Sequence, residues 1–284
     1  MDWTPEAPQP QASLPDEPYD RWVSPEGHVQ AEFHRHRQGF LIRFPHQADF
    51  VIGAEAPHTI TGWPVPECDA RTVINLYHNA IQPILGNHTG GLFLHGSAVS
   101  IGADWSDGAI AFLGLSRSGK TTLAGSFAKD GHPFLTEDVI DLRLGQGQYW
   151  LQPKRSKLRL FADSARFLLG SDAQFADEDL KQDVDAGADL PFAAKSVPLR
   201  AIFVLGNDHR ATLSIRAFSP QTALSTLVPH AFILDVEDKQ NLRGHFSRLA
   251  DLSQDISCCA LDFARDYSEL PRVRDAVLDW LSTR

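Results

Sequence analysis

The sequence predicts an α/β fold preceded by a small β-rich unit. Apolar strands alternate with a helix-like segment between Leu92 and Leu144, a pattern typical of a layered α/β domain. Before this region, short apolar stretches such as Gly39–Phe44 and Phe50–Ile52 are separated by glycine, proline and histidine, which favours strands and turns. A chain of 284 residues is long enough for one large domain and a small companion.

We expect three divisions of the chain. Residues 1–18 carry five prolines among glutamine, glutamate and alanine, and this mixture buries too little apolar surface to offset its ordering entropy, so a flexible lead is predicted. Residues 19–88 are predicted to form the β-rich unit and a linking helix, and residues 89–284 the main domain. Apolar residues recur every three or four positions over Asp69–Gly86, which predicts the helix, and Pro83 predicts a bend in it.

The elements of the main domain follow from apolar periodicity and turn residues. Strands are predicted at Leu92–Leu94, Ser97–Ile101, Ala109–Leu113, Pro133–Leu135, Val139–Leu144, Leu199–Leu205 and Ala211–Arg216. Helices are predicted at Lys120–Lys129, Pro220–Leu227, Asn241–Leu252 and Arg272–Leu281. A turn is expected over Gly102–Gly108. The acidic stretch Ser171–Asp189 is expected to be a solvated loop or a short polar helix.

Charge and composition exclude several classes of protein. The net charge is −10, so no nucleic-acid partner is expected. Every apolar run is far shorter than the roughly 20 residues that span a bilayer, so no membrane partner is expected either. Residues 1–18 lack the basic and apolar parts of a signal peptide. The three cysteines, Cys68, Cys258 and Cys259, contain no C-x-x-C pair, and this favours a reducing, cytoplasmic compartment.

One segment matches the phosphate-loop pattern G-x-x-x-x-G-K-[ST] at every fixed position. The segment consists of Gly114, Leu115, Ser116, Arg117, Ser118, Gly119, Lys120, Thr121 and Thr122. It follows a predicted strand and opens a predicted helix, which is the context that this motif requires. Such a loop presents backbone N–H groups to phosphates, while Lys120 adds a positive charge and the Thr121 hydroxyl is available to Mg²⁺. We therefore expect these nine residues to bind ATP.

Carboxylates follow the predicted strand Pro133–Leu135. A phosphate loop serves kinases and other NTPases alike, but a kinase also needs a base near the acceptor hydroxyl. Glu137 and Asp138 come at the end of this strand, and adjacent strand residues point to opposite faces. One carboxylate can therefore serve Mg²⁺ while the other accepts a proton. Both are candidate metal ligands, Asp138 is the stronger candidate for function, and Asp141 is the weaker candidate.

Two further features have competing interpretations. His95 ends a predicted strand before the loop, where a lone histidine is more often a hydrogen-bonded structural residue than a site residue. The basic segment that contains Lys154, Arg155, Lys157 and Arg159 favours a solvated strand face. The alternative is that Arg155 or Arg159 clamps phosphate charge, as arginine does in other phosphoryl-transfer sites.

The motifs and their order resemble the C-terminal catalytic domain of HPr kinase/phosphorylase and its stand-alone serine-kinase relatives. The resemblance covers Leu94-His95-Gly96, the phosphate loop, and the run from Gly131-His132 to Glu137-Asp138. It implies a P-loop kinase domain of the HPr-kinase type, with His95, Lys120 and Asp138 as catalytic residues. It further implies that Asp138 is the base in phosphorylation, that Thr121 holds Mg²⁺, and that ATP and Mg²⁺ serve to phosphorylate a serine-type hydroxyl.

Several positions depart from that family. Glu137 stands where the family has aspartate, Thr121 stands where it has serine, and the Glu-Ile-Arg-Gly-x-Gly signature is absent from the sequence. Dephosphorylation and HPr itself as a substrate are therefore not implied. The arrangement of a small β-rich unit before a kinase domain resembles stand-alone HPr-kinase-like proteins, some of which are similar to peptide-tailoring kinases. We expect a peptide or protein phosphoacceptor. A small-molecule kinase, a hydrolysing NTPase and an ATP-binding regulatory protein without turnover stay open, as does the formation of an oligomer.

Overall fold

The computed structural model describes residues 3–24, 26–55, 58–102, 108–154, 157–170, 182–185 and 190–283. The chain divides into two compact units. The first contains Met1–Leu85 and Ile233–Asp238, and the second contains Gly86–Phe232 and Lys239–Arg284. The single boundary expected after residue 88 therefore differs from the structure, because the chain leaves the second unit for residues 233–238 and then returns to it.

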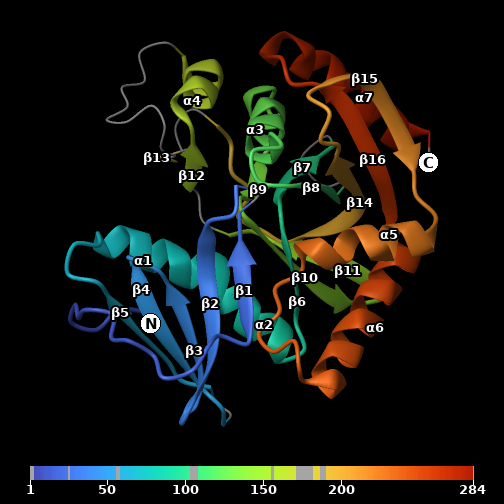
Figure 1. Cartoon of the computed structure of the whole chain (residues 1–284). Coiled ribbons are helices and arrows are strands. Elements are labelled where there is room, and N and C mark those ends of the chain that lie inside the picture. Colours follow the sequence, from blue (N-terminus) through green and yellow to red (C-terminus); the bar gives the residue numbers. More distant parts are fainter. Residues whose placement is uncertain are drawn as a thin grey trace. The chain divides into compact units, whose positions relative to one another are not determined.

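An antiparallel sheet of five strands forms most of the first unit, and its strands are neighbours in chain order (Figure 1). The strands are β1 Asp20–Val23, β2 Val29–His36, β3 Gly39–Phe44, β4 Ala48–Gly53 and β5 Ile60–Pro64. Phe33, Ile42 and Phe50 are fully buried. Register pairs Phe33 with Ile42 and Ile42 with Phe50, so the three side chains share one face of the sheet.

The linking helix is longer and less regular than predicted. It consists of α1 Ala70–Leu76, the π-helical turn η1 Tyr77–Ile81 and α2 Gln82–His88. The irregular turn lies just before Pro83, which has no N–H to donate to the preceding turn. Gly86, the expected last residue of the helix, lies inside α2. A Cβ there would lie 2.3 Å from the Phe93 ring, so packing requires the glycine.

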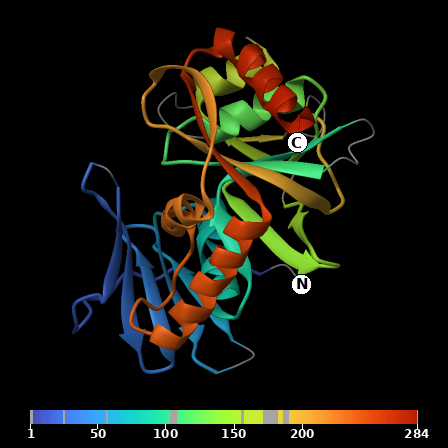
Figure 2. The ribbon, with the colours of Figure 1, turned by 90° about the vertical axis from the view of Figure 1, so that its right-hand side faces the viewer.

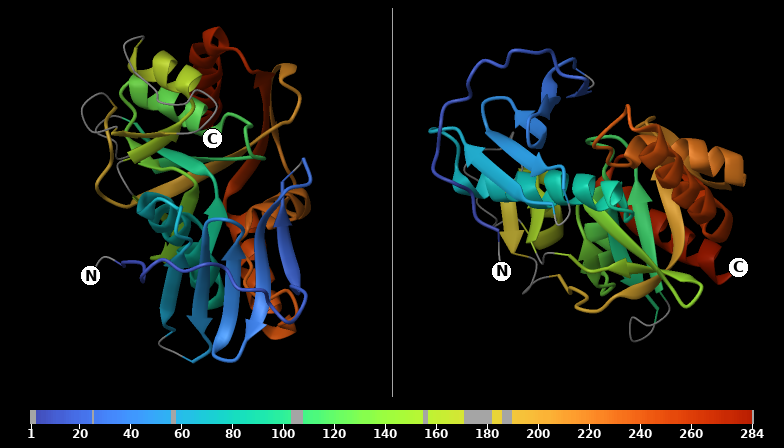
Figure 3. Two further views of the ribbon diagram at one scale, coloured as in Figure 1. Left: turned by 60° about the vertical axis from the view of Figure 1, so that its left-hand side comes forward. Right: turned by 90° about the horizontal axis from the view of Figure 1, so that it is seen from below.

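Residues 3–18 lie against the first sheet, in contrast to the flexible lead that their prolines predict. The Trp3 ring stacks on Tyr77 with centroids 4.3 Å apart, and the Glu6 N–H donates to the Gly62 carbonyl at 2.9 Å. Gln11 donates from its amide to the Asp49 carboxylate at 2.8 Å. The left view of Figure 3 shows this segment crossing the sheet. The composition did not predict these contacts, because they are made by a few separate residues and not by a run of apolar side chains.

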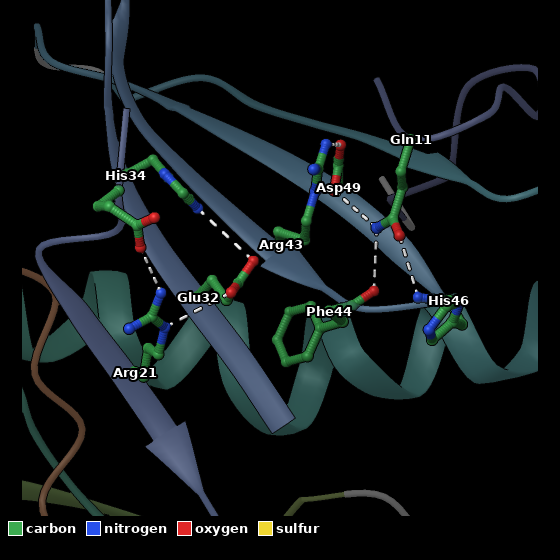
Figure 4. Close-up of polar contacts among 9 residues, drawn as sticks. Gln11, Arg21, Glu32, His34, Arg43, Phe44, His46 and Asp49 are labelled. Atoms are coloured by element: carbon green, nitrogen blue, oxygen red, sulfur yellow. Dashed lines mark hydrogen bonds and ion pairs between the residues drawn. The ribbon is translucent and has the colours of Figure 1, made fainter. Parts of the chain in front are cut away.

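A row of alternating charges crosses the first sheet. Register places Arg21 opposite Glu32, Glu32 opposite Arg43, and Arg43 opposite Asp49. The Arg43 guanidinium donates to both Asp49 oxygens at 2.9 and 2.7 Å, and the Arg21 Nε lies 3.5 Å from the Glu32 carboxylate (Figure 4). Opposite charges on neighbouring strands stabilise this register, because a slip of one residue would separate them.

Ion pairs hold residues 233–238 in the first unit. Arg35 donates to both carboxylate oxygens of Asp235 at 2.7 Å, and to Glu237 at the same distance. The Tyr19 hydroxyl donates to the Leu234 carbonyl at 2.5 Å, and the Arg35 guanidinium lies 4.4 Å from the Tyr19 ring centroid. These contacts join residues about 200 positions apart in sequence, so no local pattern predicted them.

A mixed sheet and two layers of helices form the second unit, and the expected α/β class is confirmed. The strands are β6 Leu92–His95, β7 Ser97–Ile101, β8 Gly108–Leu113, β9 Phe134–Thr136, β10 Val139–Gly145, β11 Gln148–Gln152, β14 Val197–Leu205, β15 Arg210–Ala217 and β16 Ser257–Ala264. The helices are α3 Lys120–Lys129, α4 Ala162–Leu169, α5 Pro220–Leu227, α6 Lys239–Asp255 and α7 Leu270–Ser282, with 3₁₀ turns η3 Val228–His230 and η4 Tyr267–Glu269.

Five elements of the second unit were not predicted as such. These are β11, β16, α4 and the small pair of β12 Lys157–Leu160 with β13 Gln182–Asp185. β13 corrects the expected loop or polar helix within Ser171–Asp189, of which the remaining residues lie outside the described part. Residues 103–107 of the expected turn also lie outside it. Among the described residues, no helix is both long and apolar enough to cross a membrane.

Strand β8 shows how the second unit is layered. Ile110 and Phe112 belong to the core beneath α3, α4 and α7, while Ala111 and Leu113 belong to the core beneath α5 and α6. This alternation follows the two-residue period of a strand. Figure 2 shows the two groups of helices on opposite sides of the sheet. A strand buried on both faces is a rigid support for the loop that follows it.

Candidate phosphate-binding site

The phosphate-loop segment connects β8 to α3 through a backbone that needs both of its glycines. Gly114 has φ +150° and Gly119 has φ +90°, values that glycine adopts without the strain of other residues. A Cβ on Gly114 would lie 2.6 Å from the Ser118 Oγ. The loop therefore curls tightly at the end of the buried strand before α3 begins at Lys120.

Lys120 extends back over this curl. Its ammonium donates to the Gly114 and Leu115 carbonyls, at 2.9 Å each, and the residue is only 7% exposed. The first bond of α3 runs from the Leu123 N–H to the Gly119 carbonyl at 2.9 Å, so the N–H groups of residues 120–122 precede the helical ladder. A buried ammonium and the N-terminus of α3 thus both favour an anion at this loop.

The loop also contains a buried hydroxyl that fits an anion. Ser118 is 3% exposed, and its Oγ has no hydrogen-bond partner among the described residues. A buried polar atom without a partner costs about 1–3 kcal/mol. A phosphate oxygen in the loop would accept a hydrogen bond from this hydroxyl, so the residues present fit the phosphate groups of a nucleotide.

Thr121 and Glu137 lie together, as expected of candidate metal ligands. The Thr121 hydroxyl donates to one Glu137 carboxylate oxygen at 3.1 Å, and the Arg159 N–H donates to the other. Neighbouring ligands of an octahedral Mg²⁺ lie about 2.9 Å apart, because each ligand is about 2.05 Å from the ion. The spacing of the two oxygens therefore fits joint binding of Mg²⁺.

Asp138 occupies a tight turn between β9 and β10. Its φ is +62°, and the Val139 N–H donates across it to the Glu137 carbonyl at 2.7 Å. A bond between residues two apart around a positive φ defines a rare, strained form of γ-turn. Strain of this kind costs of order 1–3 kcal/mol and gathers at functional sites. At this turn the chain leaves β9, which pairs with β7, and enters β10, which pairs with β6 and β11.

His95 and Asp138 come from two chain junctions that lie side by side. β6 pairs with β10, with His95 opposite Val139, and the Gly96 N–H donates to the Asp138 carbonyl at 3.2 Å. A Cβ on Gly96 would lie 2.6 Å from the Phe112 carbonyl in β8. The candidate base, the candidate histidine and the strand that leads into the phosphate loop are therefore brought together by backbone packing.

The remaining predicted residues are placed less directly. The Thr122 hydroxyl pairs with the Ser164 Oγ at 3.0 Å, so its side chain joins α3 to α4 and only its backbone N–H is left for a phosphate. The Arg117 guanidinium lies 5.5 Å from the Phe161 ring centroid. Arg159 contacts Glu137 through the backbone N–H of Arg159, which donates to the carboxylate. Arg155 lies outside the described residues.

Arg265 supports the phosphate loop and was not predicted. Its guanidinium donates to the carbonyls of Ser118 at 2.9 Å, Gly206 at 2.7 Å and Phe263 at 2.8 Å. Burial lowers its pKa, and the nearby Asp262 acts in the opposite direction. A single arginine about 145 positions after the loop has no signal in the sequence, since only the parallel pairing of β14 with β8 and β16 brings these segments together.

We expect Arg265→Met to lower the free energy of unfolding by about 2–4 kcal/mol, because three partly buried carbonyls lose a charged donor. ATP affinity should fall as well, since the loop loses its brace at Ser118. Urea unfolding and nucleotide titration measure the two effects. Arg272→Met is the control, because this side chain is 68% exposed and its ion pair with Glu269 contributes little. Equal stability of the two variants would contradict the bracing role.

Two buried histidines of the second unit also escaped prediction. Burial and then the charge of Lys120 lower the pKa of His230 to about 4. Burial and then the charge of Arg248 lower the pKa of His245 to about 4, and neither His245 ring nitrogen has a hydrogen-bond partner among the described residues. Both imidazoles are therefore neutral at pH 7.

These two pKa values predict a loss of stability in acid. A histidine in the unfolded chain titrates near pH 6.5, so between pH 6.5 and 4 the unfolded state binds more protons and stability falls with the pH. Lowering the pH from 7 to 5 should cost about 2 kcal/mol for each histidine. Urea unfolding at both pH values checks this. His245→Leu should lose about 2 kcal/mol less than the wild type, and an equal loss would contradict the assignment.

Comparison with solved structures gives a weak similarity. The chain is similar in structure to the HPr(Ser) kinase/phosphatase from Coxiella burnetii, with a TM-score of 0.37 and 13% sequence identity, over 68% of this chain and 98% of that one. No family model and no curated protein matches the chain. The functional conclusion therefore depends on the residues of the site itself.

Proposed function

We propose that this protein is an ATP- and Mg²⁺-dependent P-loop kinase of the HPr-kinase type that transfers the γ-phosphoryl group to a serine-type hydroxyl of a peptide or protein. The observation that carries the proposal is the position of Lys120, buried over the curl between β8 and α3 and bonded to two loop carbonyls. The Thr121–Glu137 pair and the Asp138 turn beside this loop supply the remaining groups that a kinase needs.

Each residue of the site has a defined role in this reaction. Lys120 and the loop N–H groups bind the β- and γ-phosphates and stabilise the charge of the transition state. Mg²⁺ held by Thr121 and Glu137 would neutralise charge on the same phosphates. Asp138 accepts the proton of the acceptor hydroxyl. The hydroxyl oxygen then forms a bond to the γ-phosphorus while the bond between this phosphorus and the ADP oxygen breaks. His95, beside this turn, orients Asp138 or a phosphate oxygen.

A turnover assay tests the proposal. ADP formation is measured with purified protein, Mg²⁺ and ATP, alone and with size-fractionated extract of the source cells. We expect one fraction to stimulate ADP formation and a peptide or protein in it to gain the mass of one phosphate. ADP formation that needs no acceptor would identify a hydrolase instead. A labelled metabolite would identify a small-molecule kinase, and ATP binding without turnover would identify a regulatory protein.

A further inference from the structure

His230 lies beside β6 at the end that carries His95. It is the last residue of η3 and is 8% exposed. The next residue, Ala231, forms an antiparallel bridge with Leu94. Because the two segments run antiparallel, His230 precedes Ala231 on the side where His95 follows Leu94. Two histidines that are 135 positions apart in sequence are thus neighbours at the strand end next to the Asp138 turn.

Hydrogen bonds fix the segment that carries His230. The Asn87 side-chain amide donates to the Phe232 carbonyl at 3.0 Å and to the Phe93 carbonyl of β6 at 2.9 Å. Asn87 is 3% exposed, so these bonds are shielded from water. The Phe232 ring lies 6.3 Å from the His95 ring, centroid to centroid. Residues 230–232 therefore run along β6 in a defined position.

His230 also lies near the phosphate loop, because Gly96 at the end of β6 packs against the Phe112 carbonyl of β8, the strand that leads into this loop. The Lys120 ammonium is one of the two causes that lower the pKa of this imidazole, so the charged end of the lysine lies near the ring. His230 therefore lies near both the His95 end of β6 and Lys120. A neutral imidazole has one N–H donor and one acceptor nitrogen. Such a group next to a phosphate-binding lysine can donate to a phosphate oxygen without adding charge.

We infer that His230 contacts the terminal phosphoryl group of the bound nucleoside triphosphate and donates a hydrogen bond to it. The inference rests on the proposed function, because it takes Lys120 to bind the β- and γ-phosphates. The γ-phosphoryl is the group that must reach Asp138, and His230 lies next to the strand end that adjoins Asp138. His230 therefore senses whether the third phosphate is present.

Affinities for two nucleotides test this contact. ATP and ADP, each with Mg²⁺, are titrated into the full chain of the wild type, His230→Leu and His230→Gln. We expect His230→Leu to weaken ATP binding about tenfold or more, as for a lost hydrogen bond to a charged group, and to change ADP binding less than twofold. Glutamine can still donate, so His230→Gln should keep most of the ATP affinity. A purely structural role would not separate ATP from ADP.

His245→Leu is the matched control, because His245 is equally buried in the same unit and lies on α6. It should leave the ratio of ATP to ADP affinity unchanged. Equal weakening of both nucleotides by His230→Leu, or no weakening of ATP, would overturn the inference. If the wild type binds ATP but phosphorylates nothing, the kinase proposal fails, while the affinity ratio still decides the role of His230. A wild type that does not bind ATP overturns both.

Discussion

Lys120→Met is expected to weaken ATP binding at least thirtyfold and to lower phosphoryl transfer by about a thousandfold. The variant keeps the apolar stem of the side chain but removes the ammonium of a residue that is 7% exposed. Hydrogen bonds from a charged donor contribute about 1.5–3 kcal/mol each, and loss of about 2 kcal/mol of binding corresponds to roughly thirtyfold. Transfer falls further, because charge grows on the phosphoryl oxygens in the transition state. Calorimetric titration with ATP and an ADP-release assay measure the two effects.

Lys129→Met provides the control for this experiment. Lys129 is at the opposite end of α3, where its ammonium donates to the Phe167 carbonyl at 2.6 Å on the protein surface. The same chemical change there should leave ATP binding unaltered. Folding of Lys120→Met should survive, because the substitution removes a buried charge whose desolvation is unfavourable. If a folded Lys120→Met protein binds ATP with the affinity of the wild type, the loop is not part of the nucleotide site.

The phosphate loop and its neighbours could be predicted because their signals are local. Gly114 and Gly119 mark backbone positions that strain other residues, and α3 begins at Lys120 as predicted. Asp138 was predicted as a strand-end carboxylate, but its γ-turn was not. That turn exists because β9 and β10 have different sheet partners, and sheet partners are not encoded in a local run of residues.

Residues that act from a distance could not be predicted in this way. Arg265 and His230 reach the loop region only after β16 pairs with β14 and Ala231 bridges to Leu94. A single arginine or histidine has no spacing pattern that marks such a role. The same reason applies to residues 233–238, whose place in the first unit depends on the ion pair between Arg35 and Asp235. Sequence spacing therefore predicted the strand, loop and helix of the candidate phosphate-binding segment, whereas tertiary pairing brings in the residues that support it.

Asp138→Asn is expected to lower phosphoryl transfer by about a hundred to ten thousandfold and to leave ATP affinity within about twofold. The amide is nearly the same size as the carboxylate but cannot accept the acceptor's proton. Asparagine is also among the residues that best tolerate a positive φ, so the strained turn at +62° should persist. The variant therefore tests the proton acceptor separately from the backbone. Transfer is measured as phosphate gained by the acceptor fraction, and ATP affinity by titration.

Asp130→Asn makes the same chemical change at the far end of α3. This carboxylate is exposed, forms an ion pair with Arg274 at 3.2 Å, and lies at the opposite end of α3 from the phosphate loop, so transfer should stay at the wild-type rate. If Asp138→Asn still transfers phosphate as the wild type does, another group accepts the proton. If it loses ATP binding as well as transfer, Asp138 acts through the metal rather than as the base. Loss of transfer with binding intact is the only result that assigns the proton to Asp138.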